Sequence, residues 1–204
     1  MSIHVFYQPI DISLVQEELF PYICGKGDLR KLKSMCDDPV GALTNVELLR
    51  TAYAASLAGE EFRDPEFGRC DPQSYLAESA VRDTLEFCRH VWPEWMVSAS
   101  TSIELLPDSF PVLEHYQMPI SMFEPLAEFI PDIRWDLETI AECEFMGGVL
   151  RAAHVPVVRT AIAAELANMT RCAGDPHYYD ATRTLLEALT YAEENRLSFT
   201  EAIT

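Results

Sequence analysis

The chain has 204 residues, 49% of them hydrophobic and 24% charged, so it is long enough to bury a core without disulfides or bound metals. Its unusual property is charge, because 33 acidic residues against 15 basic ones give a net charge of −18. This surplus argues against binding to nucleic-acid phosphates and against docking on an anionic membrane, since both need Lys and Arg. We therefore expect no direct nucleic-acid or membrane partner.

The first ten residues contain neither a basic segment nor a long apolar run, so they do not resemble a signal peptide. No stretch of the sequence has the length and apolar character of a membrane-spanning helix. The cysteines show no CxxC pair and no zinc-ligand spacing, which favours reduced thiols in a cytoplasmic protein over disulfides. There are six: Cys24, Cys36, Cys70, Cys88, Cys143 and Cys172.

The N-terminal elements begin with a β-like run at residues 3–7, stopped by Pro9. This run predicts either an edge strand or an extended arm. A helix is expected to start at residues 11–13 and to end at Gly25, with a kink or a shortening at Pro21.

The next two helices are indicated by their ends. The Ser/Thr-x-x-Glu pattern at residues 44–47 predicts a helix start, and Gly59 closes that helix. The polar stretch 60–71 is interpreted as a loop. The pair Asp71-Pro72 opens another helix, which Pro93 stops.

The C-terminal half starts with a proline-interrupted region over residues 94–133, in which residues 96–106 fit either a short strand or a short helix. Helices are predicted over residues 134–153, 157–172 and from Asp175-Pro176 onward. The Ser/Thr-x-x-Glu pattern at residues 198–201 predicts a last helical turn.

These elements predict an all-α fold, or nearly so. We expect a helical bundle with an irregular proline-rich acidic segment and possibly one short N-terminal strand. The bundle is expected to form a single helical domain over residues 1–204. It has a possible subdivision into N-terminal helices (1–93), an irregular acidic segment (94–133) and C-terminal helical hairpins (134–204).

The densest charge lies in residues 104–144, here called the acidic window, where ten acidic residues accompany a single base, Arg134. One interpretation is a solvated acidic face that aids solubility. The other is a docking surface for a basic partner, steered by charge and anchored by interleaved aromatic side chains. The candidate partner-binding residues are Glu124, Glu128, Asp132, Trp135, Asp136, Glu138, Glu142 and Glu144.

Recognisable catalytic chemistry is not indicated. No phosphate-binding glycine loop, nucleophile elbow or HExxH pattern is present, so we expect no catalytic residue, no cofactor and no metal. Asp83, Glu86 and His90 share one helical face, but no second helix supplies a matching ligand motif, and a surface ion pair is preferred. Glu142 and Glu144 would raise the pKa of Cys143, which opposes its activation as a nucleophile.

The leading hypothesis is therefore a cytosolic acidic protein that occludes a basic protein partner such as a toxin or nuclease. Such a protein would act as an immunity or antitoxin-like inhibitor, or as a nucleic-acid mimic. The alternative is a small helical enzyme or ligand-binding protein. Its pocket would lie between the C-terminal helices, near Gly147, Gly148, His154 and His177. A structural subunit with an incidental acidic surface is a third possibility, and the oligomeric state is left open.

Overall fold

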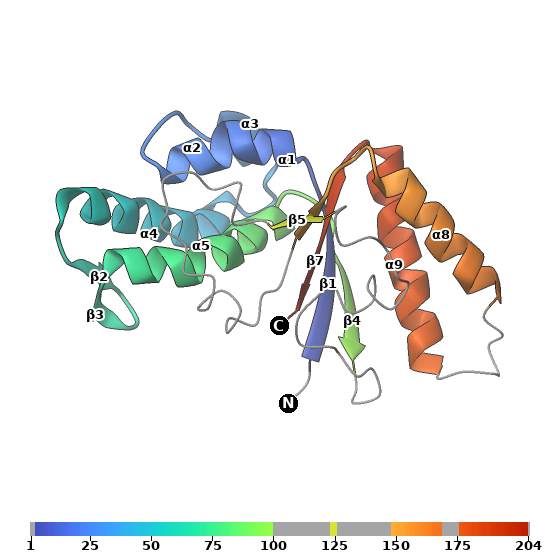
Figure 1. The fold of residues 1–204 in the computed structure, drawn as a ribbon. Coiled ribbons are helices and arrows are strands. Elements are labelled where there is room, and N and C mark those ends of the chain that lie inside the picture. Colours follow the sequence, from blue (N-terminus) through green and yellow to red (C-terminus); the bar gives the residue numbers. More distant parts are fainter. Residues whose placement is uncertain (1–2, 100–122, 126–147, 169–175, 204) are drawn as a thin grey trace. The chain divides into compact units, whose positions relative to one another are not determined.

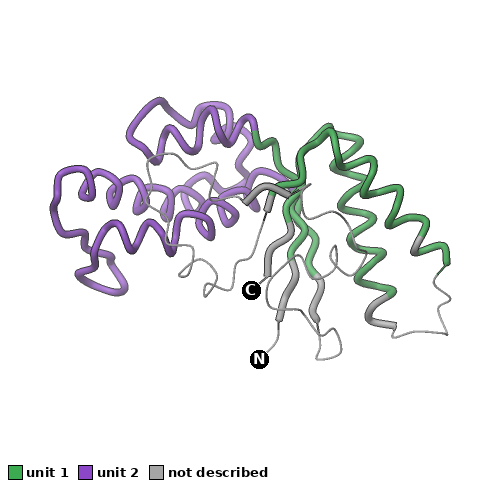
Figure 2. Tube along the Cα trace, in the orientation of Figure 1, with its two compact units in different colours: residues 1–12, 93–125, 144–204 green, residues 13–92, 126–143 purple. Residues whose placement is uncertain are grey.

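The computed structural model describes residues 3–99, 123–125, 148–168 and 176–203. The chain divides into two compact units (Figure 2). Unit 1 comprises residues 1–12, 93–125 and 144–204, and unit 2 comprises residues 13–92 and 126–143.

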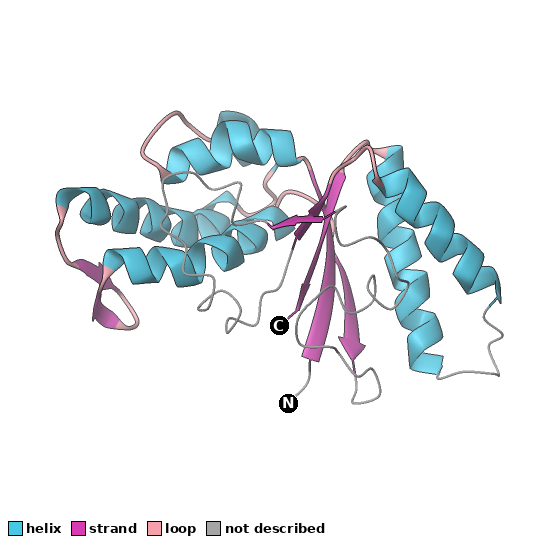
Figure 3. Ribbon diagram, viewed as in Figure 1, coloured by secondary structure: helices cyan, strands magenta, loops and turns pink. Residues whose placement is uncertain are grey.

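Unit 1 is built on an antiparallel sheet, so the expected all-α fold is wrong and the protein is mixed α/β (Figure 3). The five strands lie in the order β4-β1-β7-β6-β5. Their bounds are β1 (Ile3–Ile10), β4 (Trp95–Ala99), β5 (Phe123–Pro125), β6 (Gly148–Leu150) and β7 (Ser198–Ile203).

Strand β1 lies inside the sheet and continues through Pro9, which was expected to stop it. Pairing with β4 ends at Tyr7, opposite Trp95, whereas pairing with β7 continues to Ile10. Proline is tolerated here because only one neighbouring strand remains at this point of the ladder. The buried Gln8 amide donates to the carbonyl oxygens of Pro9 and Pro93, both at 3.2 Å.

Two helices complete unit 1, α8 (Val155–Asn168) and α9 (Pro176–Glu194). Helix α9 packs against β1, β4 and β7, and α8 packs against α9, so the order of layers is sheet, α9, α8 (Figure 1). Both helices were predicted, because each carries apolar residues at helical spacing. Leu185 and Leu189 of α9 are fully buried.

Two predicted C-terminal helical segments are corrected. The helix expected over residues 134–153 is wrong at 148–150, which form β6 between β5 and β7, while residues 134–147 lie outside the described residues. Val149 and Leu150 are fully buried there, and the preceding glycines have poor helix propensity. The last helical turn expected at residues 198–201 is also wrong, because that segment belongs to β7.

A continuous helical stretch starts at the last residue of the first segment of unit 1 and continues into unit 2. It is made of α1 (Ile12–Leu14), η1 (Val15–Leu19) and α2 (Phe20–Ile23). η1 is a π-helical turn, in which the N–H of Phe20 donates to the carbonyl of Val15. Pro21 follows at once; it has no N–H, and its ring crowds the preceding turn, which the wider π turn relieves. The stretch ends, as expected, at Gly25, which has a φ of +73°.

Three further helices follow, α3 (Arg30–Met35), α4 (Pro39–Ala58) and α5 (Pro72–Arg89), and α4 packs against α5. Helix α4 starts earlier than the 44–47 pattern predicted, because the Asp38 carboxylate accepts from the N–H of Gly41 and Pro39 occupies the first turn. The expected end at Gly59 and the expected start at Asp71 are both confirmed.

The stretch 60–71, interpreted as a loop, contains a β-hairpin. Strand β2 (Phe62–Asp64) pairs antiparallel with β3 (Gly68–Cys70), and Phe62 lies opposite Cys70. In the described part of the chain, no helix has both the length and the apolar character needed to cross a membrane.

Candidate functional site

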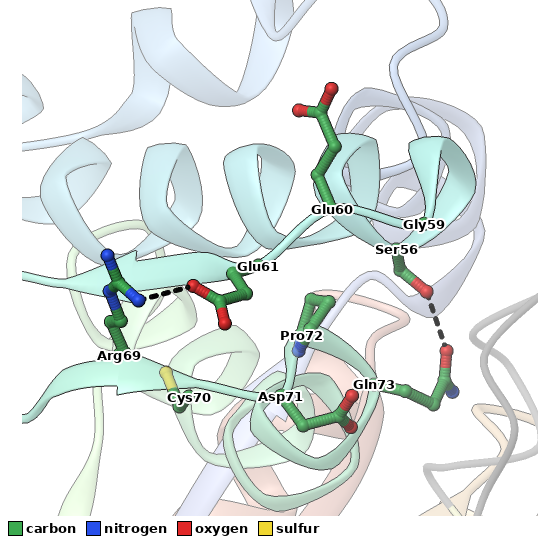
Figure 4. Close-up of a pocket in the computed structure, with 9 residues that line it drawn as sticks. All are labelled: Ser56, Gly59, Glu60, Glu61, Arg69, Cys70, Asp71, Pro72 and Gln73. Carbon is green, nitrogen blue, oxygen red and sulfur yellow. Dashed lines mark hydrogen bonds and ion pairs between the residues drawn. The ribbon is translucent and has the colours of Figure 1, made fainter.

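An open cavity of about 720 Å³ lies in unit 2, where the end of α4, the β2–β3 hairpin and the start of α5 meet (Figure 4). This volume is in the range of pockets that take small ligands. The lining residues are Ser56, Gly59, Glu60, Glu61, Arg69, Cys70, Asp71, Pro72 and Gln73.

The two helix ends that border the cavity are fixed by local chemistry. Gly59 adopts a left-handed backbone with φ +68° and donates its N–H back into the last turn of α4. At the start of α5 the Asp71 carboxylate accepts from the N–H of Ser74 at 2.8 Å, and Pro72 occupies the first turn. Both helix ends are therefore fixed by local contacts, and the hairpin connects them.

The hairpin is held together by one buried carboxylate and one aromatic contact. Asp64 accepts from the N–H groups of Glu66 and Phe67, at 2.7 and 2.8 Å, and so closes the turn between the strands. The ring of Phe62 lies 4.6 Å from that of Tyr75, measured between centroids, which anchors the hairpin on α5.

The cavity carries a surplus of negative charge. Its lining has three carboxylates, from Glu60, Glu61 and Asp71, against the single guanidinium of Arg69. Arg69 and Glu61 form an exposed ion pair at 3.1 Å at one end of the cavity. At the other end Ser56 donates to Gln73 at 3.0 Å (Figure 4). Hydrogen bonds from Ser74 hold the pKa of Asp71 below its ordinary value, so this carboxylate is ionised at neutral pH.

These groups determine what the cavity can do. Exposed carboxylates attract a cationic group, and the Ser56 and Gln73 side chains offer hydrogen bonds to a polar one. The lining residues include no histidine, and no hydrogen bond links a nucleophile to a base. The arrangement suits binding of a positively charged ligand group.

Beside the hairpin lies a buried polar network on α5. Asp83 is 3% exposed, pairs with Nε of Arg82 at 3.0 Å, and has its pKa raised by burial. Burial, together with the nearby Asp83 and Asp64 carboxylates, raises the pKa of Tyr75 to about 12. Backbone N–H donors, chiefly that of Phe67, lower the pKa of Asp64. None of these groups lines the cavity, so the network positions the hairpin.

The predicted partner-binding residues fall mostly outside the described residues. Only Glu124 is placed, in the middle of β5, where its backbone pairs with Val149. The remaining seven, Glu128, Asp132, Trp135, Asp136, Glu138, Glu142 and Glu144, have no described position.

The alternative pocket residues are described in part. Gly148 lies in β6, His154 is exposed in the turn before α8, and His177 belongs to the first turn of α9. Gly147 is outside the described residues. The cavity at the α4 end is lined by none of these residues. The sequence analysis missed the residues that line the cavity because it interpreted residues 60–71 as a loop. The signal that could have indicated a packed hairpin there is the pair of aromatic residues Phe62 and Tyr75.

Comparison with known proteins gave no match to this chain among protein-family models, curated proteins or solved structures.

Proposed function

We propose that the protein binds a basic protein partner and occludes it. The observation that carries this proposal is the charge distribution, with a net −18 for the whole chain and ten acidic residues against one base in the acidic window. Concentrated negative charge speeds association with a basic surface, and aromatic side chains such as Trp135 supply the desolvated anchors. An inhibitor of a toxin or nuclease, with the cytoplasm as its compartment, is the specific form that we propose.

The topology supports the same proposal. The acidic window spans most of the two connections that join β4 to β5 and β5 to β6, and it includes β5. Strands β4 and β5 occupy opposite edges of the sheet, so the window is tied to a folded scaffold at three places. A segment attached to the fold at three places has less conformational freedom to lose on binding than a free acidic tail has.

The test compares two variants with equal changes in net charge. Replacing Glu138, Glu142 and Glu144 by Gln removes three charges from the window. The control replaces Glu17, Glu78 and Glu194, three exposed acids outside the window, by Gln. Each form is used to capture partners from lysate at low and high salt, and the recovered basic protein is then used for association kinetics.

We expect the three substitutions in the window to slow association more than they speed dissociation, and to make the association rate less dependent on salt. The control variant should retain the wild-type kinetics. Equal kinetics for all three forms at low salt would show that the window is a solubility surface and would end the proposal.

The cavity favours a second candidate function, binding of a small cationic ligand. The reason is its size together with the three carboxylates of its lining. This site is distinct from the position between the C-terminal helices that was considered from the sequence. Asp71→Asn keeps a residue that caps helices but removes the charge, so spermidine should stabilise the wild type against heat more than this variant. No stabilisation of either form by spermidine would exclude the cavity as such a site.

A further inference from the structure

The middle residues of the two hairpin strands are both arginines. Arg63 of β2 lies directly opposite Arg69 of β3 in the antiparallel register, and both residues are exposed. Residues in direct register project from the same face of a sheet, with Cβ atoms about 5 Å apart. The neighbouring pair, Phe62 opposite Cys70, projects from the other face, where Phe62 is buried. The exposed face of the hairpin therefore carries two guanidinium groups side by side, which we call the arginine pair (Arg63 and Arg69).

The charges of the arginine pair are only partly compensated. Like charges directly opposite each other on a sheet are destabilising. The Glu61 carboxylate pairs with Nη1 of Arg69 at 3.1 Å, and the other N–H groups of this guanidinium remain for a ligand. Within the part of the chain that the structure describes, the Arg63 guanidinium has no ion pair and no hydrogen bond. A further carboxylate that bridges the two arginines would therefore relieve the repulsion between them.

The arginine pair lies at one end of the cavity at the hairpin, where Arg69 reaches Glu61 (Figure 4). Arg63 is not a lining residue and adds its charge through its place opposite Arg69. The other two lining carboxylates belong to Glu60 and Asp71. A ligand in this cavity thus meets guanidinium donors at one end and carboxylate acceptors along the rest of its length.

We propose that the cavity binds a free basic amino acid, whose carboxylate lies on the arginine pair and whose two ammonium groups lie on the lining carboxylates. This inference rests on the proposed binding of a cationic ligand in the cavity, and it adds the anionic end of that ligand. Three carboxylates against two guanidinium groups leave one net negative charge, which matches the single net positive charge of such an amino acid. A polyamine would leave the arginine pair unoccupied, and the net charge of −18 repels a polyanion.

The test is isothermal titration calorimetry with L-lysine and with cadaverine, which is lysine without its carboxylate. At about 150 mM salt, charges farther apart than about 8 Å are largely screened. We expect Arg63→Gln and Arg69→Gln each to weaken L-lysine binding by about fivefold, the contribution of one exposed ion pair. Cadaverine should bind these variants as tightly as the wild type or more tightly, because a positive charge near a dication has been removed.

Two further variants serve as controls. Arg30→Gln changes the net charge equally at an exposed arginine outside the cavity lining, so both affinities should stay at the wild-type value. Asp71→Asn should weaken both ligands, because it removes a carboxylate that the ammonium groups share. Folding of the hairpin variants is checked by urea unfolding. Arg63→Gln should retain the wild-type stability or exceed it, since it removes a contact between like charges.

Three results would overturn the proposal. Equal losses of L-lysine and cadaverine affinity in the arginine variants would mean that the ligand carboxylate does not contact the arginine pair. Inorganic phosphate that binds the wild type more tightly than L-lysine does would assign the pair to phosphate groups. Cadaverine binding that Asp71→Asn weakens, without any binding of L-lysine, would retain the cationic site and refute the amino acid. If neither ligand binds, the cationic site and the inference that rests on it both fail.

Discussion

The two phenylalanines of the hairpin give a matched test of how unit 2 is packed. Phe62 in β2 is 2% exposed and lies against Tyr75, whereas Phe67, in the turn of the same hairpin, is 76% exposed. Truncation of a fully buried phenylalanine to alanine costs about 3–5 kcal/mol, since transfer energy is lost and a cavity remains. Truncation of an exposed side chain changes stability by about 0.5 kcal/mol or less. We therefore expect Phe62→Ala to be strongly destabilising and Phe67→Ala to be nearly neutral.

The assay is urea unfolding followed by far-ultraviolet circular dichroism on the wild type and both variants. Amide hydrogen exchange over residues 62–70 is measured as well, because loss of the Phe62 side chain can open the hairpin locally before the helices unfold, and urea unfolding would not detect such local opening. Faster exchange confined to the hairpin in Phe62→Ala agrees with its role as the anchor on α5. Equal, small effects of the two substitutions on both stability and exchange would refute the packing of the hairpin described here.

Three further predictions concern strain, pH and thiols. Gly59→Ala should destabilise by about 1 kcal/mol, since φ is +68° and nothing crowds the new Cβ, and Gly59→Asn should cost less; a neutral Gly59→Ala in denaturant melts would contradict the left-handed cap. Burial raises the pKa of Asp83 above 3.8, so its ionisation opposes folding at neutral pH and this penalty fades as the pH falls through the raised pKa. In urea titrations, the free energy of unfolding of Asp83→Asn should therefore exceed that of the wild type most near neutral pH, and the difference should shrink toward pH 3.8. A difference that grows on acidification would contradict this prediction. The described cysteines, Cys24, Cys36, Cys70 and Cys88, are free, so alkylation in denaturant without reductant should label all six thiols of the chain by intact mass, and two or more missing adducts would oppose this.

Three helix ends were predicted correctly because their chemistry is local. Gly25 and Gly59 both adopt positive φ at the positions where the sequence indicated helix ends, and Asp71 caps α5 as expected. Each of these features depends on one residue and the three or four beside it. Apolar spacing likewise located α9, because a long amphipathic segment carries many concordant positions, and the apolar character of residues 157–172 located α8.

The sheet was not predictable in the same way, because its strands are short and its partners are distant in sequence. Strand β6 has only three residues, too few to show a period, and it begins at the second of two glycines inside a stretch with helix-like spacing. Strand β1 pairs with β7 at the opposite end of the chain, where Tyr7 lies opposite Glu201. No local pattern records such a pairing.

The candidate cavity shows the same division between local and distant information. Its helix ends, at Gly59 and Asp71, were identified from the sequence, but the hairpin between them was interpreted as a loop. The turn depends on Asp64, whose carboxylate accepts two backbone N–H groups, and on Gly68, which has a φ of +83°. Both are ordinary turn residues, and two three-residue strands give too few alternating positions to distinguish a hairpin from a polar loop.

Two copies of one local pattern show how tertiary pairing decides between helix and strand. At residues 44–47 and 198–201 the pattern Ser/Thr-x-x-Glu was used to predict a helix start. The first copy lies inside α4, where the Thr44 hydroxyl donates to the carbonyl of Val40 instead of capping the helix. In the second copy Phe199 and Thr200 are buried in β7, with β1 on one side and β6 on the other. The ladders on both flanks satisfy the backbone groups that a capping box would serve, and the burial of Phe199 against Tyr7 adds packing that a solvent-exposed helical turn lacks.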